Sequence, residues 1–295
     1  MNERPDIAIV GPGVVGTTLG ILAARAGYRV VGVGGRDEAR ARAAAEAIGP
    51  GVRAGKSDQI APTGRLVLLT IPDDAIEPVC RELAAAGAFA RGAIVAHCSG
   101  AISSEVLAPA RELCAAAVGS MHPLQTFPNV AAALEKFPGT YCFCEGDDAA
   151  VAALMAFAEA VGGKPIRMPS SGKLLYHAAA VFASNYLAAL LDASLTAAER
   201  AGIRRDDALA ALAPLVRATA DNVMAEGPVR ALTGPIARGD EELIARQLRE
   251  VSTADADLGR IYKLLGARAV ELAVRKGTID AAVADRLRKL LSDKG

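Results

Sequence analysis

The chain has 295 residues, of which 52% are hydrophobic and 22% are charged. This length suits about two domains, and the apolar fraction is high enough for packed cores, which excludes a disordered chain. Since 33 basic and 33 acidic residues give a net charge of zero, we expect no polyanion-binding surface and no nucleic-acid partner.

The cysteines and histidines predict neither a disulfide framework nor a metal site. The five cysteines are an odd number without paired spacing, so we expect reduced thiols. The only histidines, His97, His122 and His177, come from separate segments without a short ligand spacing, so we predict no bound metal.

The same sequence predicts a cytoplasmic protein with no membrane partner. We find no apolar run of the ~18 residues that a membrane helix needs. Residues 1–6 are short and polar, unlike a signal sequence.

The first predicted elements are a strand at residues 7–10, a glycine-rich turn and a helix. In the spacing G-x-G-x-x-G, Gly11 permits the turn, Gly13 lets a pyrophosphate approach the backbone, and Gly16 allows close helix packing. The start of the helix directs its N–H groups and positive dipole end at the phosphates. A turn without a ligand is the alternative. The residues expected to contact a dinucleotide here are Gly11, Gly13, Val14, Val15 and Gly16.

The end of a second predicted strand, residues 28–33, selects the cofactor. Arg36 lies twenty residues after Gly16, where an arginine can hold the extra phosphate of NADP and a carboxylate would bind the ribose hydroxyls of NAD. We therefore predict NADP. Asp37 keeps NAD open as an alternative, because its carboxylate could bind a ribose hydroxyl and would repel a phosphate. A solvated helix start is the third interpretation.

The alternation of strands and helices continues and predicts a doubly wound α/β domain. A helix at 38–48 precedes a continuous apolar strand at 65–71, which is typical of a parallel sheet covered on both faces. A helix to about residue 86 and a strand at 93–98 follow. Because ligands of such sheets lie beyond the carboxyl ends of the strands, the residues expected near the nicotinamide are Ile71, Pro72, Asp73 and Ser99.

A strand at 115–120 leads into a polar loop that we predict to bind substrate. His122 and Gln125 lie in this loop, next to a proline, and polar groups on a loop at a strand end are candidates for ligand contact. His122 could instead satisfy a backbone carbonyl. Further elements at 140–144, 147–161 and 164–168 complete a dinucleotide-binding Rossmann domain, for which we predict residues 1–169.

Residues 170–295 show helical periodicity without clear strands, so we predict an all-helical domain for substrate binding and dimerisation. The predicted helices cover residues 173–200, 206–226, 241–250, 254–276 and 280–292. Their apolar surface is larger than one small bundle can bury, which predicts a homodimer through this domain.

The start of the first of these helices carries the catalytic candidates. Lys173 and His177 are four residues apart, and Ser184 falls on the same face. Apolar neighbours would lower the pKa of the lysine towards neutrality, which suits a general acid or base. We predict Lys173 and His177 as catalytic residues and Ser184 as a substrate contact. A snorkelling lysine beside a core histidine is the alternative.

The order of these features resembles the superfamily that includes 6-phosphogluconate dehydrogenase, 3-hydroxyisobutyrate dehydrogenase, ketopantoate reductase and pyrroline-5-carboxylate reductase. Its members join a Rossmann domain to an all-helical C-terminal domain. More closely, the chain is similar to a bacterial family of Rossmann-like proteins whose C-terminal part is a domain of unknown function. The matching stretches are residues 11–16, 72–74, 97–101, 119–127, 173–186 and 231–240.

The resemblance implies site residues and an activity. In the β-hydroxyacid dehydrogenases a catalytic lysine opens the long helix, which corresponds to Lys173, and His177 replaces an asparagine. A serine-glycine pair that binds the substrate carboxylate there corresponds to Ser99 and Gly100. The implied function is an NADP-dependent oxidoreductase that transfers a hydride between the nicotinamide and a small carbonyl or imine substrate in an interdomain cleft. A non-catalytic NADP(H) redox sensor and a deazaflavin-dependent reductase are the alternatives.

Overall fold

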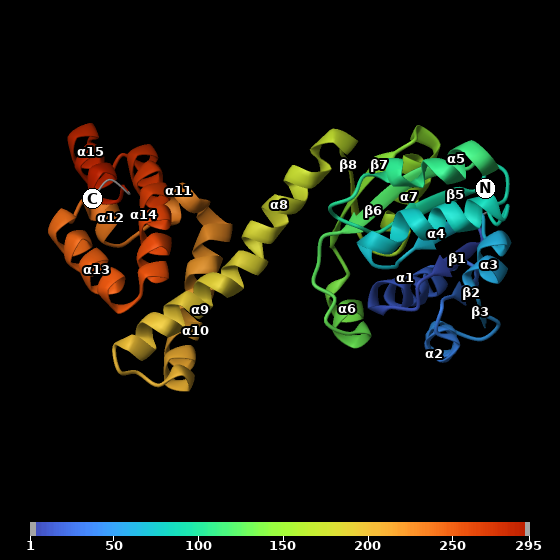
Figure 1. Cartoon of the computed structure of the whole chain (residues 1–295), viewed down its shortest axis with the longest axis horizontal. Helices are drawn as coiled ribbons and strands as arrows, with labels where there is room; N and C mark the ends of the chain where they lie inside the picture. Colours follow the sequence, from blue (N-terminus) through green and yellow to red (C-terminus); the bar gives the residue numbers. More distant parts are fainter. Residues whose placement is uncertain (1–3, 293–295) are drawn as a thin grey trace. The chain divides into compact units, whose positions relative to one another are not determined.

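The computed structural model describes residues 4–292 and divides into two compact units, one ending at Ala183 and the other beginning at Ser184. The first unit is a sheet covered by helices, and the second is helical throughout (Figure 1). The predicted class, a doubly wound α/β domain followed by an all-helical domain, is confirmed. The division falls after residue 169, the predicted boundary, because the helix that starts at Lys173 inserts that side chain into the first unit.

The sheet of the first unit has eight strands in the order β3-β2-β1-β4-β5-β6-β7-β8. All neighbouring strands are parallel except β6 and β7, which are antiparallel. The strands are β1 (Ile7–Val10), β2 (Val30–Gly34), β3 (Arg53–Gly55), β4 (Leu66–Leu69), β5 (Ile94–His97), β6 (Ala117–Pro123), β7 (Tyr141–Gly146) and β8 (Lys164–Arg167).

Helices cover both faces of this sheet, as the apolar strands require. In β1, Ile7 and Ile9 pack into one buried core and Ala8 and Val10 into the other, because successive side chains point to opposite faces. The first core includes residues of α1 (Val14–Arg25), α2 (Glu38–Ile48), α6 (Val130–Lys136) and α7 (Asp148–Ala160). The second includes residues of α3 (Ser57–Ile60), α4 (Asp73–Ala85), the 3₁₀ turn Ser104–Leu107 and α5 (Ala108–Cys114).

The antiparallel pairing of β6 with β7 corrects one sequence-based expectation. The predicted loop around His122 is partly strand, since β6 continues to Pro123 and His122 lies opposite Phe143 of β7. A partner strand far along the chain supplies the hydrogen bonds that extend β6, and no local signal predicts it. His122 is thereby fixed on the sheet.

The second unit is built from helices that bury a small apolar core made of Ile244, Val270, Ala284, Leu287 and Leu291. Its helices are α9 (Asn185–Arg200), α10 (Arg205–Glu226), α11 (Pro228–Ala231), α12 (Pro235–Arg238), α13 (Glu241–Ala254), α14 (Ala256–Lys276) and α15 (Ala281–Leu290).

The long helix predicted over residues 173–200 is interrupted. It comprises α8 (Lys173–Ala183) and α9, with Ser184 between them at φ −120° and ψ −69°. Taken together, Ser170–Arg200 is long and apolar enough to cross a membrane, with a mean hydropathy of 1.5 over its most apolar window. The expectation that no segment reaches this length and composition is therefore wrong. Polar residues interrupt every apolar run in this segment, but its mean hydropathy is still high.

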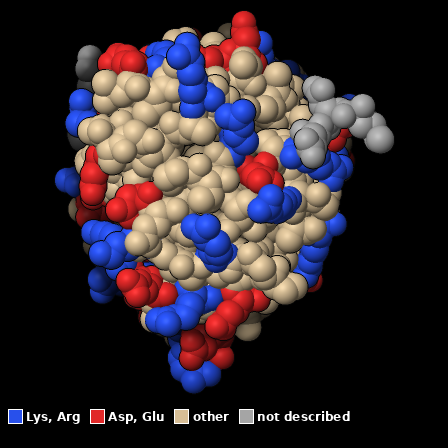
Figure 2. All heavy atoms as spheres, turned by 90° about the vertical axis from the view of Figure 1, so that its right-hand side faces the viewer, with Lys and Arg blue, Asp and Glu red and all other residues tan. Residues whose placement is uncertain are grey.

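Charged side chains of both signs are scattered among uncharged residues on the face of the first unit that Figure 2 shows. This mixture follows from the equal numbers of acidic and basic residues. Among the described residues on this face, no extended surface of a single charge is visible.

Candidate cofactor and active site

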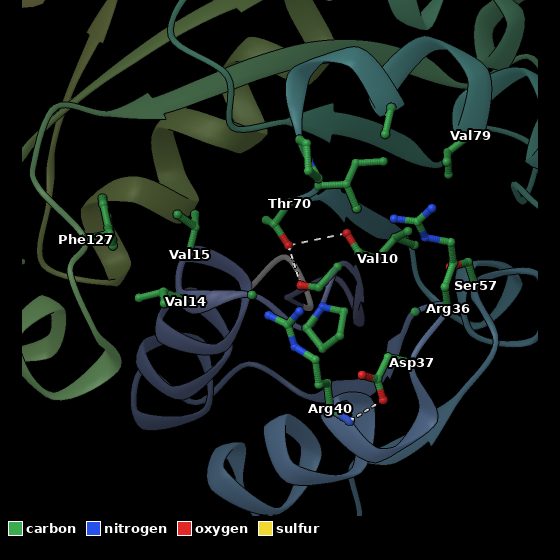
Figure 3. A pocket seen from close by; sticks show the side chains of 17 residues that line it. Val10, Val14, Val15, Arg36, Asp37, Arg40, Ser57, Thr70, Val79 and Phe127 are labelled. Atoms are coloured by element: carbon green, nitrogen blue, oxygen red, sulfur yellow. Dashed lines mark hydrogen bonds between the residues drawn. The ribbon is translucent and has the colours of Figure 1, made fainter.

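A cavity of about 470 Å³ lies where the order of the strands reverses, beyond the carboxyl ends of β1 and β4. This is the position at which doubly wound sheets bind dinucleotides. In Figure 3, Val14, Val15 and Phe127 lie on one side of the cavity, and Arg36 and Ser57 lie on the other. Its lining includes seven of the ten predicted cofactor residues: Gly11, Gly13, Val14, Val15, Arg36, Ile71 and Pro72.

The three glycines of the turn have different surroundings. Gly11 has φ +117°, and a Cβ there would lie 2.5 Å from the Thr70 carbonyl oxygen. A Cβ on Gly16 would lie 2.3 Å from the Gly11 carbonyl oxygen, so Gly16 permits close packing and does not line the cavity. At Gly13 only one atom lies within 4 Å of such a Cβ, at 3.9 Å. Gly13 begins α1 without a side-chain cap, which leaves the first N–H groups available for a phosphate.

On the far side of the cavity, Arg36 and Asp37 differ in what their side chains contact. The Oδ1 atom of Asp37 accepts hydrogen bonds from the backbone N–H groups of Ala39 and Arg40, at 3.0 and 3.1 Å. Asp37 is thus the N-cap of α2, and this oxygen is engaged with the helix. Arg40 lines the cavity together with Arg36 and Ser57. Arg40 was missed in the sequence, although it follows Arg36 by about one helical turn.

Asp73 and Ser99 connect the edge of the cavity to a second group of polar residues. The Oγ atom of Ser99 donates to Asp73 Oδ2 at 2.9 Å and accepts from the N–H groups of Ala101 and Ile102. Pro72, just before Asp73, lines the cavity, whereas Asp73 and Ser99 do not. Their hydrogen bond joins the segment after β5 to the start of α4.

Two histidines lie against Gly100, and a tyrosine is hydrogen-bonded to one of them. A Cβ on Gly100 would lie 2.8 Å from Cε1 and Nε2 of His122 and 2.8 Å from Nδ1 of His177. The other ring nitrogen of His122, Nδ1, lies 2.8 Å from the Tyr176 hydroxyl. The ring of Tyr176 packs against Phe143, with centroids 4.3 Å apart. A side chain at Gly100 would clash with both imidazoles, so glycine at this position lets the two rings pack directly against the backbone.

Burial makes the His122–Tyr176 pair neutral at pH 7. Burial, with the nearby positive charge of Lys173 and the ring of His177, lowers the pKa of His122 to about 4. Burial raises the pKa of Tyr176 above its usual value. The hydrogen bond therefore joins a phenol and an uncharged imidazole. His177 Nδ1 is buried and has no hydrogen-bond partner in the described part of the chain, so it can bond to a ligand.

Lys173 is placed differently from the sequence-based expectation. Its side chain is only 2% exposed, and its Nζ donates to Glu145 Oε1 at 3.0 Å and to Ser120 Oγ. Burial lowers the pKa of Lys173, in the predicted direction, while Glu145 opposes that shift. The purely apolar setting that we predicted is wrong, because Glu145 lies 28 residues earlier in the chain and carries no signal of this pairing. Lys173 does not line the cavity.

Two predicted substrate residues lie outside this group. Gln125 uses its side chain within its own loop, where Oε1 accepts from the Thr126 N–H and Nε2 donates to the Lys136 carbonyl oxygen. Ser184 lies at the break between α8 and α9 and is the first residue of the second unit. Within residues 4–292 no group of three or more His, Cys, Asp or Glu side chains could hold a metal ion.

Family models match both parts of the chain. A Rossmann-like domain matches residues 1–123, and a domain of unknown function, DUF2520, matches residues 140–269. No curated protein matches the chain in sequence.

Solved structures share the fold over most of the chain. Protein TM1727 from Thermotoga maritima is 27% identical, with a TM-score of 0.71 over 92% of this chain and 99% of that one. An imine reductase from Pseudomonas sp. is 18% identical, with a TM-score of 0.62 over 98% and 100%. A reductive aminase from Aspergillus terreus, in complex with NADPH, is 17% identical, with a TM-score of 0.56 over 98% and 93%.

These likenesses establish the architecture that the strand order and the helical second unit already show. The fold is that of enzymes bound to nicotinamide cofactors. With a Rossmann-like domain before a DUF2520 domain, the chain belongs to the family of Rossmann-like proteins with this C-terminal domain of unknown function.

Proposed function

We propose that this protein is an NADP-dependent oxidoreductase that reduces a small carbonyl or imine substrate. The observation that carries the cofactor assignment is that both Arg36 and Arg40 line the cavity, while Asp37 between them caps α2. Two guanidinium groups suit the additional phosphate of NADP. The shared fold with an imine reductase and an NADPH-bound reductive aminase supports the reaction class.

Reduction requires a proton donor as well as a hydride, and the residues around Gly100 supply this donor in the proposed reaction. When bound, the reduced nicotinamide supplies the hydride that forms the new C–H bond. The negative charge that develops on the substrate oxygen or nitrogen then needs a proton. In this proposal the neutral His122–Tyr176 pair gives that proton and is reprotonated from water, and His177 Nδ1 orients the substrate. Glycine at position 100 lets both imidazoles approach the backbone at this point.

Replacing Arg36 by alanine tests the cofactor assignment. A charge-assisted hydrogen bond to a phosphate contributes roughly 1.5–3 kcal/mol, so NADPH affinity should fall by about 10- to 100-fold. NADH affinity should change little, because NADH lacks the phosphate. The change in nicotinamide fluorescence on titration measures both dissociation constants.

Arg42→Ala is the matched control for this experiment, because Arg42 is an exposed arginine of the adjoining helix α2 that does not line the cavity. It should leave both affinities within about two-fold. Equal losses of NADPH and NADH affinity in Arg36→Ala would contradict phosphate recognition.

The reaction itself is tested by following NADPH oxidation with a set of ketones, keto acids and cyclic imines. Tight NADPH binding without turnover of any of them would favour the redox sensor.

We also propose that the exposed apolar surface of the helices is covered by a second copy of this chain. Leu174, Leu175 and Leu215 are 71%, 79% and 62% exposed, which is unusual for leucine. A lipid partner is disfavoured, because the same segment begins with the buried ion pair of Lys173 and Glu145 inside an α/β unit.

Light scattering tests the dimer. Wild-type protein at micromolar concentration should have twice the 30.2 kDa mass of one chain, and Leu175→Glu should shift it towards the monomer by burying a charge in the interface. Leu113→Glu changes a leucine of α5 that is 63% exposed and should leave the mass unchanged. A monomeric wild-type protein would refute the proposal.

A further inference from the structure

The buried ion pair between Lys173 and Glu145 is the most strongly connected polar group of the first unit. The two side chains are 2% and 1% exposed. Besides Lys173, Glu145 accepts from the backbone N–H and hydroxyl of Ser104 at 2.9 and 2.8 Å, and from the hydroxyl of Ser170 at 2.8 Å. Burial of two charges is costly, and four donors on one carboxylate offset that cost. So many polar contacts around one buried ion pair suggest that the pair does more than stabilise the fold.

The pair joins the start of α8 to the strands beneath it in a fixed register. Lys173 binds Ser120, and three residues later Tyr176 meets His122, two residues along β6. Three residues of helix rise about 4.5 Å, and two residues of strand rise about 6.6 Å, so the two contacts follow one another along neighbouring elements. Ser120 and His122 lie on the same face of the strand. A shift of α8 by one residue would break both contacts together.

Apolar packing contributes little to holding this helix. Lys173 is the only buried residue of α8, all of whose residues are described. Its neighbours Leu174 and Leu175 are largely exposed. Helices of globular proteins usually take their position from a buried apolar face, which α8 does not present to the first unit. The polar contacts of its first turns, together with the packing of the Tyr176 ring against Phe143, therefore determine where Tyr176 and His177 lie.

We propose that Lys173 and Glu145 are positioning residues, whose ion pair holds α8 in the register that brings Tyr176 to His122 and His177 to Gly100. This inference rests on the function proposed above and assigns Lys173 a role different from direct proton transfer. The side chain acts through the helix that it anchors, and it has no contact with the cofactor cavity. Apolar residues in its place would fill the same volume without specifying the register.

The test uses the double variant Lys173→Met/Glu145→Leu, which removes both charges and leaves neither buried alone. Three quantities are measured: the NADPH dissociation constant, the rate of NADPH oxidation, and the downfield proton resonance of the His122–Tyr176 hydrogen bond in the cofactor-free protein. We expect the dissociation constant to stay within about two-fold, the rate to fall at least ten-fold, and the resonance to disappear or broaden. Arg111→Met, which breaks the Arg111–Asp147 ion pair away from α8, should leave all three unchanged.

A folded double variant with the wild-type resonance and rate would overturn the proposal. A fall in rate with the resonance intact would also overturn it, because Lys173 would then act on the substrate directly. The resonance is measured without cofactor or substrate, so the positioning role can be judged even if no reductase activity is found. Loss of the resonance in Arg111→Met as well would reduce the ion pair to one of several general contributions to folding.

Discussion

Replacing Tyr176 by phenylalanine should slow the chemical step by at least about 100-fold, the lower range for loss of a positioned general acid. The substitution removes one oxygen and keeps the ring against Phe143, so NADPH affinity and folding should be close to wild type. Single-turnover oxidation of bound NADPH by the best substrate separates chemistry from product release. A loss of affinity without a loss of rate would place Tyr176 in binding instead.

Two further variants make this prediction specific. His122→Asn should cost about as much as Tyr176→Phe, and the double variant should be little worse than either, because residues that act as a unit are not additive. Tyr141→Phe is the matched control, since Tyr141 is a tyrosine of β7 that is 48% exposed. Independent, multiplying losses from His122 and Tyr176 would contradict a shared proton donor.

The rate should also be insensitive to pH above the pKa of His122. That pKa is lowered to about 4, so the imidazole is already neutral at pH 6 and can keep its hydrogen bond with Tyr176. Below about pH 4 the protonated Nδ1 can only donate to the Tyr176 oxygen, so the imidazole no longer accepts a hydrogen bond from the phenol and the neutral pair is lost. An inflection near the ordinary histidine value of 6.5 would indicate a solvated ring.

Local sequence patterns predicted most of the named residues that line the cavity, because each of these signals lies within a few residues of the backbone that it shapes. The glycine spacing specifies one turn, and Arg36 follows the end of the next strand. The doubly wound class follows from the same reasoning, since apolar strands such as β4 alternate with helices along the chain. The positions of the strand ends then place Ile71 and Pro72 at the cavity.

The contacts of His122 and Lys173 could not be predicted to the same depth, because they join residues far apart in the chain. His122 and Tyr176 are 54 residues apart, and Glu145 and Lys173 are 28 apart. His122 and Lys173 are recognisable in the sequence as unusual residues for their surroundings. Their partners, Tyr176 and Glu145, are brought to them only by the tertiary fold. The antiparallel β7 supplies both Phe143 and Glu145, and nothing in its sequence indicates its direction.

Replacing Glu145 by leucine should destabilise the protein by about 3–5 kcal/mol, since it leaves the buried ammonium of Lys173 without its partner. The loss should appear as a lower urea midpoint. Circular dichroism is the suitable probe because the chain has no tryptophan. The measurement belongs at pH 7. Burial would raise the pKa of Glu145, but Lys173 and the hydroxyls of Ser104 and Ser170 lower this pKa overall. The stabilisation that Glu145 gives is therefore complete at a pH above the pKa of an unfolded glutamate, and it is lost as the pH falls through the lower pKa of the folded state.

The same prediction includes a recovery of stability in a double variant. Adding Lys173→Met to Glu145→Leu should restore most of the lost stability, because a well-packed apolar pair often replaces a buried ion pair at little net cost. The thermodynamic cycle of the two single variants and the double variant gives the coupling energy. Recovery of stability without recovery of the reaction rate would show that the ion pair specifies the position of α8 more than it stabilises the fold. If the double variant is as unstable as Glu145→Leu alone, the site has an additional need for charge, and the ion pair would then be part of the folding core itself.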